Sequence, residues 1–151
     1  MDGHRDTDEF RSRYAVVGAK RGVDLLQLRE ALEAAWDPDT SYQGAFQEGN
    51  PALGQCYPTS RVMQSFFPTL DIAKGTVWTG ASSESHFWNV LFVNDVACHI
   101  DLSWQQFPSG SSVTSFEILD RDCLLDSGET VERCHRLEER VLAYLMGHLQ
   151  A

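Results

Sequence analysis

Two largely apolar runs, HFWNVLFV (86–93) and VACHIDLS (96–103), are separated only by Asn94 and Asp95. Asparagine and aspartate tolerate the left-handed backbone conformation that a two-residue hairpin turn requires. Short apolar runs on both sides of such a turn are typical of paired strands. This stretch therefore predicts an antiparallel hairpin.

The predicted turn also fixes the register of the two strands, because the residues that flank it face each other. Counting back along both strands sets Trp88 opposite Asp101. His86 then falls opposite Ser103. Side chains alternate across a strand, so these four residues share one face, on which His86 and Asp101 are diagonal neighbours within side-chain reach. The opposite face is the expected core face, with Phe87, Asn89, Leu91, Val93, Val96, Cys98 and Ile100.

Helical periodicity predicts two helices before the hairpin and one after it. The leucines of VDLLQLREALEAAW (23–36) recur at helical spacing, and Asp24 is suited to cap the helix start. A second helix is expected in GQCYPTSRVMQSFFP (54–68), with Pro58 in the first turn, where proline is tolerated. The segment 129–149 carries an apolar stripe at helical spacing: Val131, Cys134, Leu137, Val141, Tyr144, Leu145 and Leu149.

The remaining segments predict short strands and one long loop. Strands are expected within residues 70–78 and 113–119, and residues 39–54 read as a loop rich in Gly, Asn, Ser and Gln. Helices on either side of an antiparallel sheet indicate an α+β fold. We expect a single domain over residues 1–151, in which residues 1–22 form a loosely ordered arm.

The charge of the chain restricts its partners. Twelve basic and 22 acidic side chains give the 151 residues a formal net charge of −10. Such a surface repels phosphate backbones and anionic lipids, so we expect neither nucleic acid nor a membrane as partner. No apolar run approaches the roughly 18–20 residues of a membrane-spanning helix, and the first residues are polar and charged. We therefore predict a cytoplasmic protein with reduced cysteines; its oligomeric state is not indicated.

One cysteine, Cys56, occupies a position suited to chemistry. It lies at the start of the second predicted helix, where unpaired N–H groups stabilise a thiolate. An imidazole oriented by a carboxylate can activate such a thiol, and His86 with Asp101 supplies that pair. The other cysteines are predicted to be core or structural residues, with Cys98 on the apolar hairpin face, Cys134 in the helical stripe and Cys123 structural or exposed.

A thiol nucleophile also needs donors for the oxyanion that forms during acyl transfer. The backbone N–H of Cys56 is one candidate donor. The side chains of Gln55, Gln47 and Asn50 are candidates for the second, and spacing alone does not choose among them. Trp88 shares the face of His86 and is a candidate wall of the substrate cleft.

The segments GQCYPTS, HFWN and HIDLSWQQF, in this order, resemble the YunG-like family of small bacterial proteins. That family is similar to the papain-like and transglutaminase-like thiol enzymes, which include the NlpC/P60 peptidases and the arylamine N-acetyltransferases. The resemblance covers roughly residues 53–107. It implies a nucleophile helix packed on a small antiparallel sheet, with Cys56 as nucleophile, His86 as general base and acid, and Asp101 as the orienting group.

These observations predict a cysteine-dependent enzyme that hydrolyses an amide, peptide or thioester bond in a small molecule or peptide through a thioester intermediate. It would need no cofactor. Transfer of the acyl group to an amine would use the same three residues and stays open as an alternative. Two further alternatives are a non-haem metal site formed by His86, His99 and Asp101, and a catalytically inactive binding module.

Overall fold

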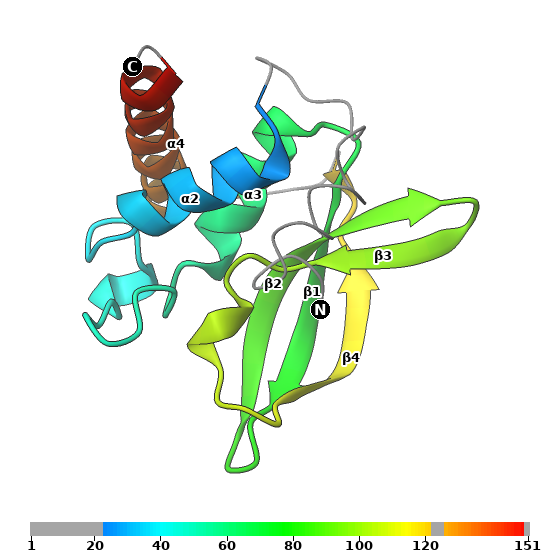
Figure 1. Cartoon of the computed structure of the whole chain (residues 1–151). Coiled ribbons are helices and arrows are strands. Elements are labelled where there is room, and N and C mark those ends of the chain that lie inside the picture. The colour runs from blue at the N-terminus through cyan, green and yellow to red at the C-terminus, as the bar shows by residue number, and fades with distance from the viewer. Residues whose placement is uncertain (1–22, 122–125, 150–151) are drawn as a thin grey trace.

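The computed structural model describes residues 23–121 and 126–149. The predicted arm, residues 1–22, and Cys123 lie outside this range. Within it, three α-helices and a curled four-stranded antiparallel sheet form an α+β fold (Figure 1). The helices are α2 (Leu25–Ala35), α3 (Cys56–Phe66) and α4 (Gly128–Leu149). The strands are β1 (Asp71–Trp78), β2 (Ser83–Val93), β3 (Val96–Ile100) and β4 (Ser112–Ile118).

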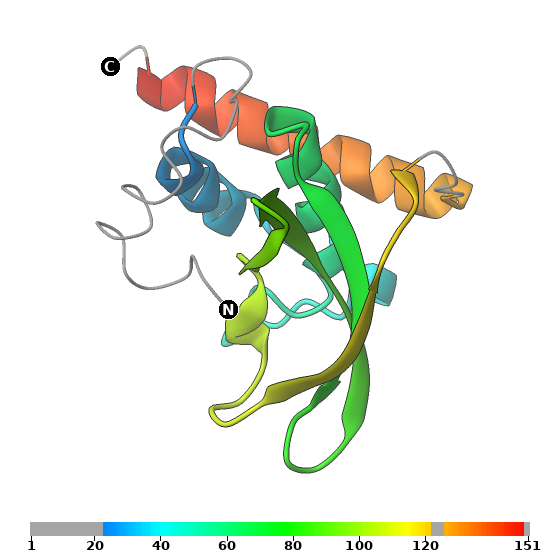
Figure 2. The same ribbon diagram turned by 90° about the vertical axis from the view of Figure 1, so that its right-hand side faces the viewer.

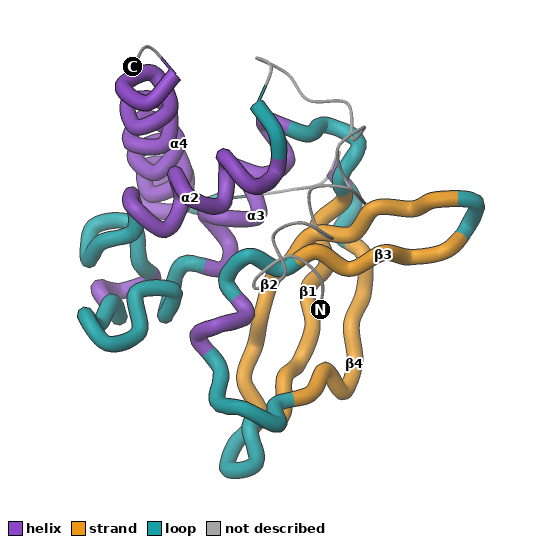
Figure 3. The backbone as a smooth tube through the Cα atoms, in the orientation of Figure 1, coloured by secondary structure: helices purple, strands orange, loops and turns teal. Residues whose placement is uncertain are grey.

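The hairpin formed by β2 and β3 has the predicted register. Val93 pairs with Val96, and Asn89 pairs with Ile100. Asn94 and Asp95 have φ values of 50° and 65°, which is the left-handed conformation expected of this turn. The order of strands across the sheet is β3-β2-β1-β4, and every neighbouring pair is antiparallel. The chain therefore returns after β3 to the far side of β1, which Figure 3 traces along the backbone.

The second strand of the hairpin is shorter than predicted. It ends at Ile100, so Ser103 does not pair with His86 in the ladder. The reason is local: one carboxylate oxygen of Asp101 accepts hydrogen bonds from the backbone N–H and the hydroxyl of Ser103, both at 3.0 Å. Aspartate commonly turns the chain in this way. The turn is followed by a short 3₁₀ helix at Trp104–Gln106.

The helices cover one face of the sheet, and α3 is the element that joins them to it. It contacts both β2 and α4, while α2 packs against α4 (Figure 2). Ile100 is fully buried in the core between these layers, and Leu91 and Cys98 pack against that core, as predicted for this hairpin face. The amide of Asn89 donates to the backbone oxygen of Ser60 at 3.1 Å, which places the polar member of this face against the middle of α3.

Some predicted core residues are exposed because their elements extend beyond this packing. Val93 and Val96 are 48% and 62% exposed at the tip of the hairpin, which projects from the body of the molecule (Figure 1). Val131 is 54% exposed, whereas Leu137, Val141 and Leu145 of the same helix are buried. Val131 lies in the first turn of α4, where it lines a groove together with Arg61, Val62 and Ser65 of α3.

The start of each of the first two helices is fixed by local interactions. Asp24 and Gln27 form a reciprocal capping box at α2, which confirms the predicted cap. The long loop before α3 ends at Gly54, which has a φ of +78°. A Cβ at this glycine would lie within 3.2 Å of Ser41, Tyr42 and Ala45. Only glycine combines this conformation with such a close approach, so Gly54 lets the loop close directly before Cys56.

None of the helices in the described part of the chain is long and apolar enough to cross a membrane.

A second buried cluster lies on the opposite face of the sheet, where Trp88 rests on Gly75. Trp88 is 1% exposed and packs with Ala73 and Val90. A Cβ built on Gly75 would lie 2.5 Å from the indole of Trp88 and 2.9 Å from the Cβ of Phe116. The indole therefore occupies space that any side chain at Gly75 would need.

We predict that Gly75→Ala lowers the free energy of unfolding by about 1–3 kcal/mol, the usual cost of overpacking a core. The matched control is Gly49→Ala, because a Cβ at Gly49 meets no atom within 4 Å. Urea denaturation monitored by circular dichroism measures both variants. Equal stability of the two variants would show that the indole does not depend on this glycine.

Candidate active site

The predicted pair of His86 and Asp101 forms a direct contact inside the protein. Nε2 of His86 lies 2.5 Å from Oδ2 of Asp101. His86 is 0% exposed and Asp101 is 2% exposed, so water does not screen their interaction. The other carboxylate oxygen, Oδ1, is held by the backbone N–H and the hydroxyl of Ser103. Both oxygens of Asp101 are thus fixed, and the carboxylate holds the imidazole in one orientation.

Cys56 is the first residue of α3, and its thiol interacts with the same imidazole. Burial by itself lowers the pKa of His86, but the charge of Asp101, the hydrogen bond to Asp101 and the interaction with Cys56 raise it from 6.5 to about 9. Since Nε2 is bound to Asp101, Nδ1 is the nitrogen left for the thiol, and it makes no hydrogen bond of standard geometry in the described structure. The carboxylate therefore binds one ring nitrogen of His86, and the other is available to the thiol.

Aromatic rings enclose His86. The ring of Phe107 meets it edge-on with centroids 4.7 Å apart, and the indole of Trp104 lies at 6.1 Å. Trp88, the predicted wall, stacks on His86 at 5.7 Å, but it is buried beneath the imidazole. Cys56 is partly exposed, so substrate would approach from the side of the thiol.

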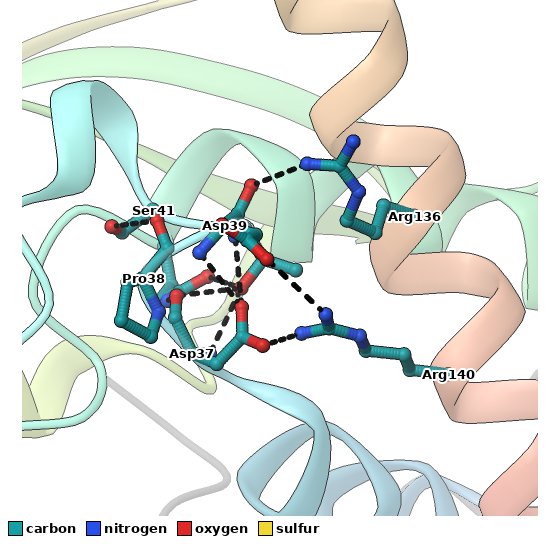
Figure 4. Close-up of polar contacts among 8 residues, drawn as sticks. Asp37, Pro38, Asp39, Ser41, Arg136 and Arg140 are labelled. Atoms are coloured by element: carbon teal, nitrogen blue, oxygen red, sulfur yellow. Dashed lines mark hydrogen bonds and ion pairs between the residues drawn. The ribbon is translucent and has the colours of Figure 1, made fainter.

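The side chain of Gln55 anchors the residue directly before Cys56. Its oxygen accepts from the hydroxyl of Thr40 at 2.8 Å, and its nitrogen donates to the backbone oxygen of Asp37 at 3.0 Å. The turn at residues 37–41 is tied in turn to α4. Arg140 forms ion pairs with Asp37 and Asp39, and Arg136 donates to the backbone oxygen of Asp39 (Figure 4). The turn at residues 37–41, itself tied to α4, thus positions the start of α3.

The neighbouring residue on α3, Tyr57, supplies a second anchor. Its ring packs edge-on against Phe87 of β2 with centroids 4.7 Å apart, and its hydroxyl donates to Asp126. Burial and this hydrogen bond raise the pKa of Tyr57, so the hydroxyl stays protonated and keeps its donor. The first turn of α3 is therefore held against the strand that carries His86.

The three candidate oxyanion donors lie in different environments. Gln55 is 0% exposed with both ends of its amide hydrogen bonded, so it acts here as an anchor. Gln47 is exposed on the loop before α3. Asn50 is partly buried, and its amide donates to the backbone oxygen of Gln106 at 2.9 Å. Asn50 thus links the loop before Cys56 to the turn after Asp101, and the second donor stays a prediction.

Two positioning contacts of the site were not anticipated from the sequence. Ser103 was expected to face His86 from the ladder, whereas it holds Asp101; the Asp-Leu-Ser order is a recognisable signal for such a turn. Thr40 holds Gln55 across 15 positions of the chain, and nothing in the local sequence indicates that pairing.

The arrangement does not favour the alternative metal site. Nε2 of His86 is bound to Asp101, and Nδ1 of His99 accepts a hydrogen bond from the indole of Trp88 at 2.9 Å. Trp88 also has ring contacts with both histidines. Across residues 23–121 and 126–149, no group of three or more His, Cys, Asp or Glu side chains is arranged to hold a metal ion.

The raised pKa of His86 makes the stability of the protein dependent on pH. The folded state binds the imidazole proton more tightly than the unfolded state does, because the pKa rises from 6.5 to about 9. This contribution is complete below pH 6.5, declines between pH 6.5 and 9 and is lost above that range. We predict that the stability advantage of the wild type over His86→Gln falls as the pH rises through this window.

Urea denaturation at several pH values measures this difference. His135→Gln is the matched control, since the side chain of His135 is 70% exposed and pairs only with Glu139 among the contacts described. An advantage over His86→Gln that stays constant from pH 6.5 to 9 would contradict a proton held by Asp101.

Comparison with known proteins gives one family. The family model described as "YunG protein" matches residues 24–146. Comparison with curated proteins finds no match, and comparison with solved structures finds none either. The matched range includes Cys56, His86 and Asp101 and all the helices and strands described above except the last three residues of α4. Since the match spans most of its length, the chain belongs to the YunG family.

Proposed function

We propose that this protein is a cysteine-dependent acyl-transfer enzyme with a papain-like or transglutaminase-like core. Cys56 is the nucleophile, His86 the general base and acid, and Asp101 the residue that orients His86. The observation that carries the proposal is the buried contact of 2.5 Å between His86 and Asp101, with the thiol of Cys56 at the same imidazole.

A structural role alone explains this contact poorly. Burying an ion pair removes both charges from water, and the gain in attraction seldom exceeds that cost by much. A buried pair with a strongly shifted pKa beside a partly exposed thiol is instead typical of a reactive centre. The position of Cys56 in the first turn of α3 adds unpaired backbone N–H groups, which stabilise negative charge on sulfur.

The first half of the proposed reaction forms a thioester. The thiolate of Cys56 attacks the carbonyl carbon of the substrate, and the carbonyl electrons move to oxygen. The resulting oxyanion can accept a hydrogen bond from the backbone N–H of Cys56. The bond to the leaving group then breaks as the oxyanion collapses. The proton held by His86 passes to the leaving amine, alcohol or thiol. Asp101 stabilises the imidazolium before this transfer.

The second half releases the acyl group. His86, now neutral, removes a proton from the acceptor, which attacks the thioester and regenerates the thiolate. We propose water as the acceptor, so that the reaction is hydrolysis of an amide, peptide or thioester bond. The walls next to His86 come from Phe107 and the single turn Trp104–Gln106, which suits a small molecule or a flexible peptide segment.

Selective alkylation tests whether Cys56 is activated. At about pH 6, where an ordinary thiol is almost wholly protonated, we predict that iodoacetamide modifies Cys56 faster than Cys98 or Cys134. Burial and the charge of Asp126 raise the pKa of Cys134 to about 11, which makes it a slow internal reference. Peptide mass spectrometry measures the rates. Equal rates at the three cysteines, or the slowest rate at Cys56, would count against the proposal.

Acyl adducts test the chemistry itself. Incubation with activated acyl donors should add one acyl group to the wild type, and Cys56→Ala should abolish this mass increase. We expect His86→Gln to slow acylation by roughly 100-fold or more, the usual contribution of a general acid and base. Cys98→Ala is the matched control and should behave as the wild type. An adduct that persists in Cys56→Ala would assign the nucleophile elsewhere.

A further inference from the structure

The residues of the proposed active site come from two layers of the fold. Cys56 begins α3 in the helical layer, whereas His86 belongs to β2 and Asp101 follows β3 in the sheet. The interaction of the thiol with the imidazole therefore depends on how firmly the two layers are joined beside it. Hydrogen bonds on the far side of Asp101 supply such a joint.

The side chain of Gln106 binds the residue that holds Asp101. Its Nε2 donates to the backbone oxygen of Ser103 at 3.1 Å, and it has a longer contact of 3.4 Å with the hydroxyl oxygen of Ser103. That hydroxyl donates its single proton to Asp101, so the longer contact meets a lone pair of the oxygen. The backbone N–H of Gln106 donates to the same backbone oxygen of Ser103 at 3.1 Å. Gln106 thus closes the turn that presents Ser103 to Asp101.

The backbone oxygen of Gln106 binds the loop that leads to Cys56. It accepts a hydrogen bond of 2.9 Å from Nδ2 of Asn50, across 56 positions of the chain. Among the hydrogen bonds of the described residues, this one alone joins residues 39–54 to residues 101–107. Gln106 therefore contacts both parts of the site, one through its side chain and the other through its main chain.

The short segment between Asn50 and Cys56 is itself held by hydrogen bonds. The backbone N–H of Leu53 donates to the backbone oxygen of Asn50 at 3.1 Å. The backbone N–H of Gln55 donates to that of Ala52 at 3.0 Å, and Ala52 is buried in the core between the layers. Because contiguous hydrogen-bonded structure carries a displacement from one end to the other, a shift of Asn50 is passed on to the start of α3.

These contacts form a series that closes on itself, which we call the closed network. It runs through Cys56, His86, Asp101, Ser103, Gln106 and Asn50 and returns along the chain to Cys56. We propose that Gln106 is a positioning residue that keeps Cys56 and His86 in contact by closing this network. The inference rests on the proposed function of Cys56 and His86. Gln106 acts through Ser103 on one side and through Asn50 on the other.

Opening the closed network should weaken the pairing of thiolate and imidazolium. Their attraction falls with distance, so the fraction of Cys56 that is thiolate at about pH 6 falls as they separate. Alkylation by iodoacetamide measures this fraction, since the thiolate is the reacting form. Dividing the rate at about pH 6 by the rate at about pH 9, where most ordinary thiols are ionised, removes differences in access to the sulfur. Peptide mass spectrometry gives both rates for each cysteine.

Gln106→Met keeps the length of the side chain and removes its donor. We expect this variant to lower the ratio of the two rates at Cys56 by about threefold or more, the effect of one net hydrogen bond. Gln64→Met is the matched control, because Gln64 is also partly buried and its Nε2 donates to the backbone oxygen of Leu70 at 3.0 Å, outside the closed network. It should have the wild-type ratio. Equal ratios in the two variants would overturn the inference.

Asn50→Leu breaks the other contact of Gln106, because leucine has nearly the shape of asparagine but no donor. By itself it should lower the ratio at Cys56 as Gln106→Met does. In the double variant the closed network is already open, so the second substitution should add little to the first. Two effects that multiply would identify independent anchors and overturn the inference. Circular dichroism at both pH values verifies that every variant is folded.

Acylation of the wild type separates this inference from the proposed function. If activated acyl donors modify Cys56 and Gln106→Met has the wild-type ratio, the proposed function stands and the inference fails. If no donor modifies Cys56 but Gln106→Met and Asn50→Leu lower the ratio, the closed network positions an activated thiol and the proposed function fails. A wild-type ratio at Cys56 no higher than that at Cys98 would overturn both.

Discussion

The contact between His86 and Asp101 determines most of what surrounds it. Two charged groups without exposed surface are tolerated only where each is oriented and bonded, and the neighbouring structure provides this. The early end of β3 turns Asp101 out of the ladder, and Ser103 occupies its second oxygen. The turn that follows brings two aromatic rings, Trp104 and Phe107, against the imidazole. A single carboxylate thus sets the length of a strand, the course of the next turn and the enclosure of His86.

The helices position Cys56 beside the same contact. Cys56 meets His86 only if the start of α3 is held at the right place against β2. Gln55 and Tyr57, on either side of the cysteine, both use their side chains as anchors. One anchor leads through the turn at residues 37–41 to α4, and the other leads to Asp126 and Phe87. The sulfur of Cys56 therefore lies between two anchored neighbours.

Local sequence patterns were sufficient to predict the helices and strands. They were not sufficient to predict where these elements end or which side chains anchor them. The hairpin register follows from Asn94-Asp95 and alternation alone, and the structure confirms it. Because that register is predictable, so is the shared face of His86 and Asp101. The exposure of Val93 and Val96 depends on how far the helices reach along the hairpin, and the spacing of apolar residues carries no information about that distance. The partners of Gln55 are likewise distant in sequence, so spacing could suggest a polar role for it but not which one.

The tie between α4 and the turn at residues 37–41 makes the geometry at Cys56 sensitive to ionic strength. Arg140 and Asp37 have side chains that are 35% and 32% exposed, so dissolved ions reach this pair and weaken it. The buried contact of His86 with Asp101 is shielded from the same ions. Salt therefore weakens the contacts that position Cys56, whereas the contact that orients His86 keeps its strength.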